Sequence, residues 1–231
     1  MSENYQVLIT GANRGLGLEF ASQYAKSGWR VLACCRQPEH ATELNALAVM
    51  FKNIQILPLD VANFTQIEAL ALQLEALPID VLINNAGIYP DSHSTEINTN
   101  AWLDAFTVNC ISPFKIATAF TTHIANSQLK KIVTLTSKMG SIDDNTSGSN
   151  YIYRSTKAAA NMVTKSLSID LKPLGISTVT LHPGWVQTDM GGSNALINAE
   201  TSVTGMRQII EQLNLNNTGR FIAYDGKIIN W

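Results

Sequence analysis

Tyr153 and Lys157 are the residues of this sequence best suited by type and spacing to acid–base chemistry. They lie four residues apart in the run YRSTK, so on a helix the phenol and the ammonium would share one face. A free tyrosine titrates near pH ~10 and is a poor acid–base catalyst at neutral pH. A cation held a few ångströms away favours the phenolate and lowers the pKa of the tyrosine. The spacing alone is not specific, because a solvated lysine beside a packed tyrosine is common in helices.

A glycine-rich turn lies near the start of the chain, at residues 10–17 (TGANRGLG). It follows an apolar run and opens an amphipathic one, which indicates a strand, a tight turn and a helix. Gly11, Gly15 and Gly17 would let the backbone approach a ligand closely, and the helix N-terminus would attract a pyrophosphate. The spacing G-x3-G-x-G differs from the more familiar G-x-G-x-x-G, and a purely structural turn is the alternative.

The second apolar run ends in Cys35 and Arg36, where NAD-specific sites place a carboxylate against the adenosine ribose. Arg36 can instead bind a 2′-phosphate, and Arg14 in the glycine turn could supply a second positive charge. The sequence therefore favours NADP(H) over NAD(H). The alternative is that both arginines are solvated surface residues.

Short apolar runs alternate with amphipathic stretches along the whole chain, which predicts βαβ units and a doubly wound parallel sheet with helices on both faces. The expected strands are residues 5–9, 30–34, 54–59, 81–83, 131–136, 177–181 and 220–224. The expected helices are residues 16–27, 41–50, 65–74, 101–125, 151–171 and 202–212. Two longer loops, residues 140–150 and 183–200, are rich in Gly, Ser, Asn and Asp.

Composition limits the classes of protein that fit. A chain of 231 residues with 45% hydrophobic and 15% charged residues predicts one domain, residues 1–231, with one large core. The net charge of −2 and the absence of a basic run argue against nucleic acid as a partner. No run reaches the ~18–20 apolar residues of a membrane span, and the N-terminus does not resemble a signal peptide. Cys34, Cys35 and Cys110 lack metal-ligand spacing, so we expect reduced thiols, no metal and a cytoplasmic protein.

Further motifs follow in a fixed order: Asn84-Asn85-Ala86-Gly87 after the fourth expected strand, Ser137 after the fifth, and the Tyr153–Lys157 pair at the start of a long helix. Together with TGANRGLG, they resemble the short-chain dehydrogenase/reductase family over essentially the whole chain. The resemblance implies a single-domain Rossmann fold with a seven-stranded sheet. Three longer runs, residues 137–167, HPGWVQTDMGG and GRFIAYDGKIINW, are similar to the C-factor/sniffer-like carbonyl reductase branch.

By this resemblance, Tyr153 donates the proton to a carbonyl oxygen, and Lys157 lowers the pKa of Tyr153 and binds the nicotinamide ribose. Ser137 would hold the substrate oxygen, and Asn109 would anchor a water that links Lys157 to solvent. Asn109 could instead be a satisfied buried amide. Ser141 competes with Ser137, but only Ser137 directly follows the expected strand.

The resemblance also implies a row of cofactor contacts. Asp60 would contact the adenine, unless it only ends a strand or caps the next helix, and Val186 would donate its backbone N–H to the carboxamide. The complete set of expected cofactor-binding residues is Gly11, Asn13, Arg14, Gly15, Leu16, Gly17, Arg36, Asp60, Val61, Asn85, Ala86, Gly87, Tyr153, Lys157, Pro183, Gly184, Val186 and Thr188.

The expected function is NADPH-dependent reduction of a carbonyl compound. Met139, Tyr151, Trp185 and Met190 suggest an apolar pocket mouth, and the short segment after Gly184 favours small or planar aldehydes, ketones and quinones. The alternatives are a C-factor-like signalling protein that binds a dinucleotide, and an NAD-dependent alcohol dehydrogenase. We expect a homodimer or homotetramer paired through helices 101–125 and 151–171, unless these faces only meet the sheet.

Overall fold

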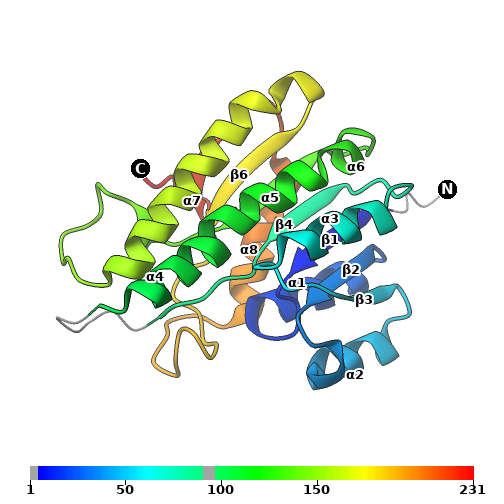
Figure 1. Cartoon of the computed structure of the whole chain (residues 1–231), viewed down its shortest axis with the longest axis horizontal. Helices are drawn as coiled ribbons and strands as arrows, with labels where there is room; N and C mark the ends of the chain where they lie inside the picture. The colour runs from blue at the N-terminus through cyan, green and yellow to red at the C-terminus, as the bar shows by residue number, and fades with distance from the viewer. Residues whose placement is uncertain (1–4, 91–96) are drawn as a thin grey trace.

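The computed structural model describes residues 5–90 and 97–231 and shows a seven-stranded sheet between two layers of helices (Figure 1). Neighbouring strands are parallel throughout, in the order β3-β2-β1-β4-β5-β6-β7. The predicted doubly wound Rossmann fold is therefore confirmed. The strands are β1 (Gln6–Thr10), β2 (Arg30–Cys35), β3 (Ile54–Pro58), β4 (Val81–Asn84), β5 (Lys131–Leu135), β6 (Ser177–His182) and β7 (Arg220–Ala223).

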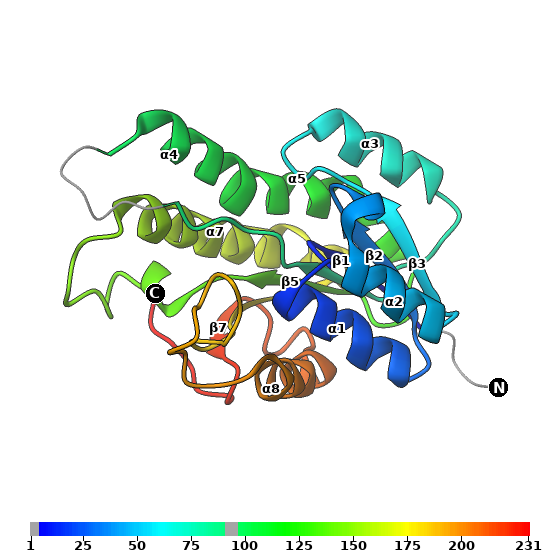
Figure 2. The same ribbon diagram turned by 90° about the horizontal axis from the view of Figure 1, so that it is seen from below.

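Helices cover both faces of the sheet, as the alternating sequence pattern predicts (Figure 2). One face carries α1 (Gly15–Lys26), α2 (Thr42–Met50) and α8 (Ala199–Gln212). The other face carries α3 (Phe64–Gln73), α4 (Thr99–Phe106), α5 (Ser112–Ala119), α6 (Thr121–Ala125) and α7 (Tyr151–Asp170). Three 3-10 turns, η1 (Pro38–His40), η3 (Lys138–Gly140) and η4 (Lys172–Leu174), connect larger elements.

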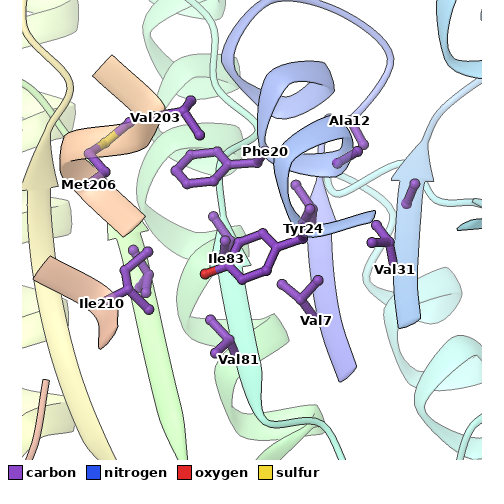
Figure 3. Packing of buried hydrophobic residues seen from close by; sticks show 14 of the residues in the cluster. Val7, Ala12, Phe20, Tyr24, Val31, Val81, Ile83, Val203, Met206 and Ile210 are labelled. Carbon is purple, nitrogen blue, oxygen red and sulfur yellow. The ribbon is translucent and has the colours of Figure 1, made fainter. Parts of the chain in front are cut away.

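Side chains alternate between the two faces of each central strand, and this builds two separate cores. Val7 and Ile9 of β1 pack toward α1 and α8, whereas Leu8 packs toward α3, α5 and α7. Figure 3 shows the first core, in which Phe20 of α1 lies near Met206 of α8 above the sheet. A sheet buried on both faces explains the unbroken apolar character of the strand sequences.

The single helix expected at residues 101–125 is wrong. The chain instead forms α4, a π-helical turn η2 (Thr107–Ile111), α5 and α6. Pro113 near the start of α5 has no backbone N–H to continue an α-helical ladder, and the helix breaks again at Phe120. The wider turn η2 contains Asn109, and such turns are frequent at functional sites.

The strand order predicts a ligand crevice at the carboxyl ends of β1 and β4. The chain runs from β1 to a helix on one face and from β4 toward a helix on the other, so the loops that follow these strands separate. Ligands of open α/β sheets bind at this position. Across residues 5–90 and 97–231, none of the helices has the length and apolar character needed to cross a membrane.

Candidate active site

The glycine turn after β1 has a backbone that only glycine fits. Gly11 and Gly15 have φ angles of +65° and +54°, and a Cβ atom on Gly17 would lie 2.2 Å from the carbonyl oxygen of Gly11. Because α1 begins at Gly15, its N-terminal N–H groups and partial positive charge lie at this turn. The turn therefore fits a bound pyrophosphate, as the sequence predicts.

Asn85 and Ala86 tie the end of β4 to the end of β1. The Asn85 side-chain amide donates to the carbonyl oxygens of Thr10 (2.8 Å) and Gly11 (3.0 Å). The Thr10 hydroxyl accepts from the backbone N–H groups of Asn85 (3.0 Å) and Ala86 (3.1 Å). These bonds hold the two strand ends in register at the floor of the crevice.

At the end of β2, Cys35 is buried and Arg36 is exposed, an arrangement that suits a 2′-phosphate better than two ribose hydroxyls. Asp60 does form a turn, because its Oδ1 accepts from the N–H of Ala62 (3.0 Å). Val61 is buried beside this turn, and its carbonyl oxygen accepts from the Ser112 hydroxyl (2.7 Å). Asp60 does not cap the next helix, because the N-cap of α3 is Asn63, whose side chain accepts from the N–H of Gln66. The contact of Asp60 with adenine stays a prediction.

Arg14 lies at the glycine turn but forms an ion pair with Asp189 of the loop after β6, at 2.8 Å between Nη1 and Oδ2. Both side chains are exposed. The pair connects the two sides of the crevice. A 2′-phosphate that used Arg14 would compete with Asp189 for it.

The loop after β6 lies over the glycine turn. Gly184 has a φ angle of +85°, and a Cβ atom there would lie 2.8 Å from Ile197. Val186 is buried and bridges to Ile197. A Cβ atom on Gly15 would lie 3.3 Å from the Thr188 methyl group, so the expected nicotinamide loop and the expected pyrophosphate turn are adjacent.

Ser137 and Tyr153 meet at the carboxyl end of β5. Ser137 follows β5 after one residue, Thr136, and caps η3, where its Oγ accepts from the N–H of Met139 (3.1 Å). Burial raises the pKa of Tyr153, and a hydrogen bond with Ser137 lowers it by less. The phenol is therefore neutral at physiological pH, which is the form that can donate a proton.

Lys157 lies on the same face of α7 as Tyr153, with its Nζ 5.5 Å from the centre of the phenol ring. Burial lowers the pKa of Lys157 to about 8, and Cys110 opposes this shift. Its Nζ donates to the carbonyl oxygen of Leu135 (3.0 Å). The sequence analysis expects Lys157 to lower the pKa of Tyr153. In the structure, the group that lowers this pKa is Ser137, through a hydrogen bond.

Asn109 and Lys157 both lie against Gly87. A Cβ atom on Gly87 would lie 3.2 Å from Asn109 Oδ1 and 3.5 Å from Lys157 Nζ. The Asn109 side chain accepts from the N–H of Ile88 (2.9 Å) and donates to its carbonyl oxygen (2.9 Å) and to the Thr156 hydroxyl (3.1 Å). Asn109 is thus a satisfied buried amide that joins the chain after β4 to α7, and its role toward a water stays a prediction.

A family model described as short chain dehydrogenase matches residues 5–199. This chain belongs to the short-chain dehydrogenase/reductase family. The match contains the glycine turn, Ser137, Tyr153 and Lys157, which the fold brings to one edge of the sheet.

Three individual proteins are similar to this chain over most of their length. C-signal of Myxococcus xanthus is 42% identical over 165 residues, which cover 67% of this chain and 93% of that protein. The structure of the carbonyl reductase Sniffer of D. melanogaster is 37% identical with a TM-score of 0.93, over 99% of this chain and 100% of that chain. The NADPH-bound carbonyl reductase from chicken fatty liver is 34% identical with a TM-score of 0.93 over the same shares.

The sequence analysis missed Tyr89 of this short-chain dehydrogenase/reductase. Its ring meets the ring of Tyr153 edge-on, with 4.5 Å between centroids, and its hydroxyl donates to Asn150 Oδ1 (2.7 Å). Asn150 precedes α7 in a left-handed conformation. The position of Tyr89 two residues after the NNAG motif was the signal that could have identified it.

Three of the side chains expected at the pocket mouth of this dehydrogenase/reductase are exposed. Tyr151, Trp185 and Met190 each expose about half of their surface, and the Trp185 indole N–H donates to the carbonyl oxygen of Gly191 (2.7 Å). Their place at a pocket mouth stays a prediction. Within the described residues, no three His, Cys, Asp or Glu side chains gather where a metal ion could bind.

Proposed function

We propose that this protein is an NADPH-dependent carbonyl reductase. The observation that carries the proposal is the approach of the Ser137 hydroxyl to the buried Tyr153 phenol, beside Lys157 at the same end of the sheet as the glycine turn. When bound, the cofactor would supply a hydride, and the chain would supply placement and a proton.

In this proposal, Ser137 and Tyr153 donate hydrogen bonds to one substrate oxygen. Two converging donors stabilise the negative charge that develops on that oxygen during reduction. Tyr153 then transfers its proton, which burial keeps on the phenol until it is needed. Lys157, whose lowered pKa of about 8 allows it to exchange a proton near neutral pH, would restore the proton and bind the nicotinamide ribose.

NADP(H) is the dinucleotide that these residues favour. Arg36 is exposed at the end of β2, and Arg14 lies at the glycine turn. The chicken structure was solved with NADPH, and a carbonyl reductase from Pseudomonas aeruginosa PAO1, 30% identical with a TM-score of 0.87, with NADP. Both support the same cofactor for this chain.

The substrate class is a small or planar aldehyde, ketone or quinone. The exposed Tyr151, Trp185 and Met190 make an apolar entrance without a long lid, because only residues 183–198 separate β6 from α8. A cytoplasmic location is part of the proposal, and the buried free thiols of Cys34, Cys35 and Cys110 support it.

The test is a comparison of two neighbouring tyrosines. NADPH absorbance would be followed with a panel of aldehydes, ketones and quinones for the wild type, Tyr153→Phe and Tyr151→Phe. Loss of the proton donor should lower kcat at least ~100-fold in Tyr153→Phe. Tyr151 is 58% exposed, whereas Tyr153 is 8% exposed. The kcat of Tyr151→Phe should therefore stay within a few-fold of the wild-type value. Full activity of Tyr153→Phe would refute the proposed mechanism.

A second candidate is a signalling protein that binds a dinucleotide. The 42% identity to C-signal favours it, and that identity spans 93% of the relative. NADPH binding without turnover across the panel would support this candidate. The intact Ser137, Tyr153 and Lys157 argue for chemistry, because binding alone does not require a proton donor.

A further inference from the structure

The chain after β7 turns back and pairs with it. The N–H of Ala223 donates to the carbonyl oxygen of Lys227 (2.8 Å), and the N–H of Ile229 donates to that of Phe221 (2.8 Å). The Trp231 ring stacks on Phe221, with 5.5 Å between ring centroids. We call residues 227–231 the C-terminal return.

The C-terminal return is fastened to the segment that follows Ser137. The Ser141 hydroxyl donates to the carbonyl oxygen of Asn230 (2.7 Å) and accepts from the N–H of Asp144 (3.1 Å). The N–H of Asp143 donates to the carbonyl oxygen of Trp231 (3.1 Å), and the Asn230 side chain donates to Asp143 Oδ2 (2.9 Å). Ser141 is only 2% exposed, so its hydroxyl is fully engaged in a buried junction.

The segment that follows Ser137 also contacts Ser137 itself and α7. The N–H of Gly140 donates to the carbonyl oxygen of Ser137 (2.8 Å), and the carbonyl oxygen of Gly140 accepts from the Asn161 side chain (3.2 Å). A Cβ atom on Gly140 would lie 2.8 Å from the Lys157 carbonyl carbon, so η3 rests directly on α7. A shift at Ser141 would therefore be transmitted to Ser137 through a single tight turn.

We propose that Ser141 is a positioning residue, whose hydroxyl fastens η3 to the C-terminal return and thereby fixes the catalytic Ser137. The kinetic part of this inference rests on the proposed reductase function. Ser141 was a competitor of Ser137 for the substrate in the sequence analysis. The structure gives it a different place, at the far end of the turn that Ser137 begins.

The experiment compares Ser141→Ala, a chain shortened to end at Ile229, and the control Lys227→Ala. Lys227 lies on the same C-terminal return but pairs with Asp225 at the surface. Loss of the junction should lower kcat for the carbonyl about three- to tenfold and raise its KM, whereas the Kd for NADPH stays within about twofold. Lys227→Ala should match the wild type. Wild-type kcat and KM in both Ser141→Ala and the shortened chain would overturn the inference.

Hydrogen exchange supplies a readout that does not need turnover. Backbone amides of residues 138–144 should exchange faster in Ser141→Ala than in the wild type, while those of the glycine turn keep their rates. If the wild type reduces no carbonyl, the proposed function fails, and the exchange rates still decide the inference about Ser141. Unchanged exchange in residues 138–144 would refute it.

Discussion

Arg14 and Asp189 face each other across the crevice, and their ion pair bears on cofactor choice. Asp189→Asn should free Arg14 for a 2′-phosphate. We expect NADPH to bind about two- to fivefold more tightly, the range of an exposed ion pair, with NADH binding unchanged. Fluorescence titration with both cofactors measures this.

The Arg14→Ala background is the control for that experiment, because there Asp189→Asn should have no effect on NADPH binding. Weaker NADPH binding in the single variant Asp189→Asn would mean that the pair closes the crevice over the cofactor rather than competing with it.

The lowered pKa of Lys157 predicts that the stability of the protein depends on pH. Its pKa falls from 10.5 to about 8 in the folded protein because burial disfavours the ammonium. Between these values the unfolded chain binds more protons, so this residue makes the free energy of unfolding rise as the pH increases from about 8. In Lys157→Met that contribution should disappear. The free energy of unfolding of the wild type should therefore rise, relative to that of the variant, by on the order of 1–2 kcal/mol between pH 7 and pH 9.5.

Urea unfolding at four pH values across this range would measure the difference. Lys131, whose pKa is also lowered by burial, is present in both proteins, so its contribution cancels. A constant difference between the two proteins at all pH values would contradict the prediction.

At the scale of elements, the β1–α1 junction depends on Gly17. A methyl group there would lie 2.2 Å from the Gly11 carbonyl oxygen and 2.6 Å from the Asn85 side chain, both fixed by other bonds. Gly17→Ala should therefore destabilise the protein by about 2 kcal/mol or more and weaken NADPH binding. Thermal unfolding and fluorescence titration test both effects, and wild-type values in both would show that the turn can relax.

The elements were predictable from the sequence to different degrees. Apolar runs of residue types suited to buried parallel strands located all seven strands within about a residue at either end. The π-helical turn η2 was not predictable, because its Asn109 bonds to Ile88, and a contact between separate segments leaves no local pattern in the sequence. For the same reason, the contacts of Tyr89 and Ser141 appeared only once the fold had brought separate segments together.

At the scale of the whole molecule, α5 and α7 carry exposed apolar side chains on their outer faces. Phe114, Met162 and Ile169 are exposed there, which supports the expected pairing of two copies through these helices. We predict a dimer by light scattering at micromolar concentration, and a monomer for the double variant Met162→Glu/Ile169→Glu. The control Val49→Glu/Met50→Glu places the same charges on exposed positions of α2 and should stay dimeric. A monomeric wild type would contradict the prediction.

The backbone pairing of residues 227–229 with β7 has a consequence for how the protein resists misassembly. A parallel sheet has two edge strands, whose unpaired backbone groups can pair with a strand of another molecule. Here the edge strand β7 is already paired with an antiparallel segment of the same chain, through a bridge between Ile222 and Ile228. Fibre-like growth would have to start at β3, the strand at the opposite end of the order.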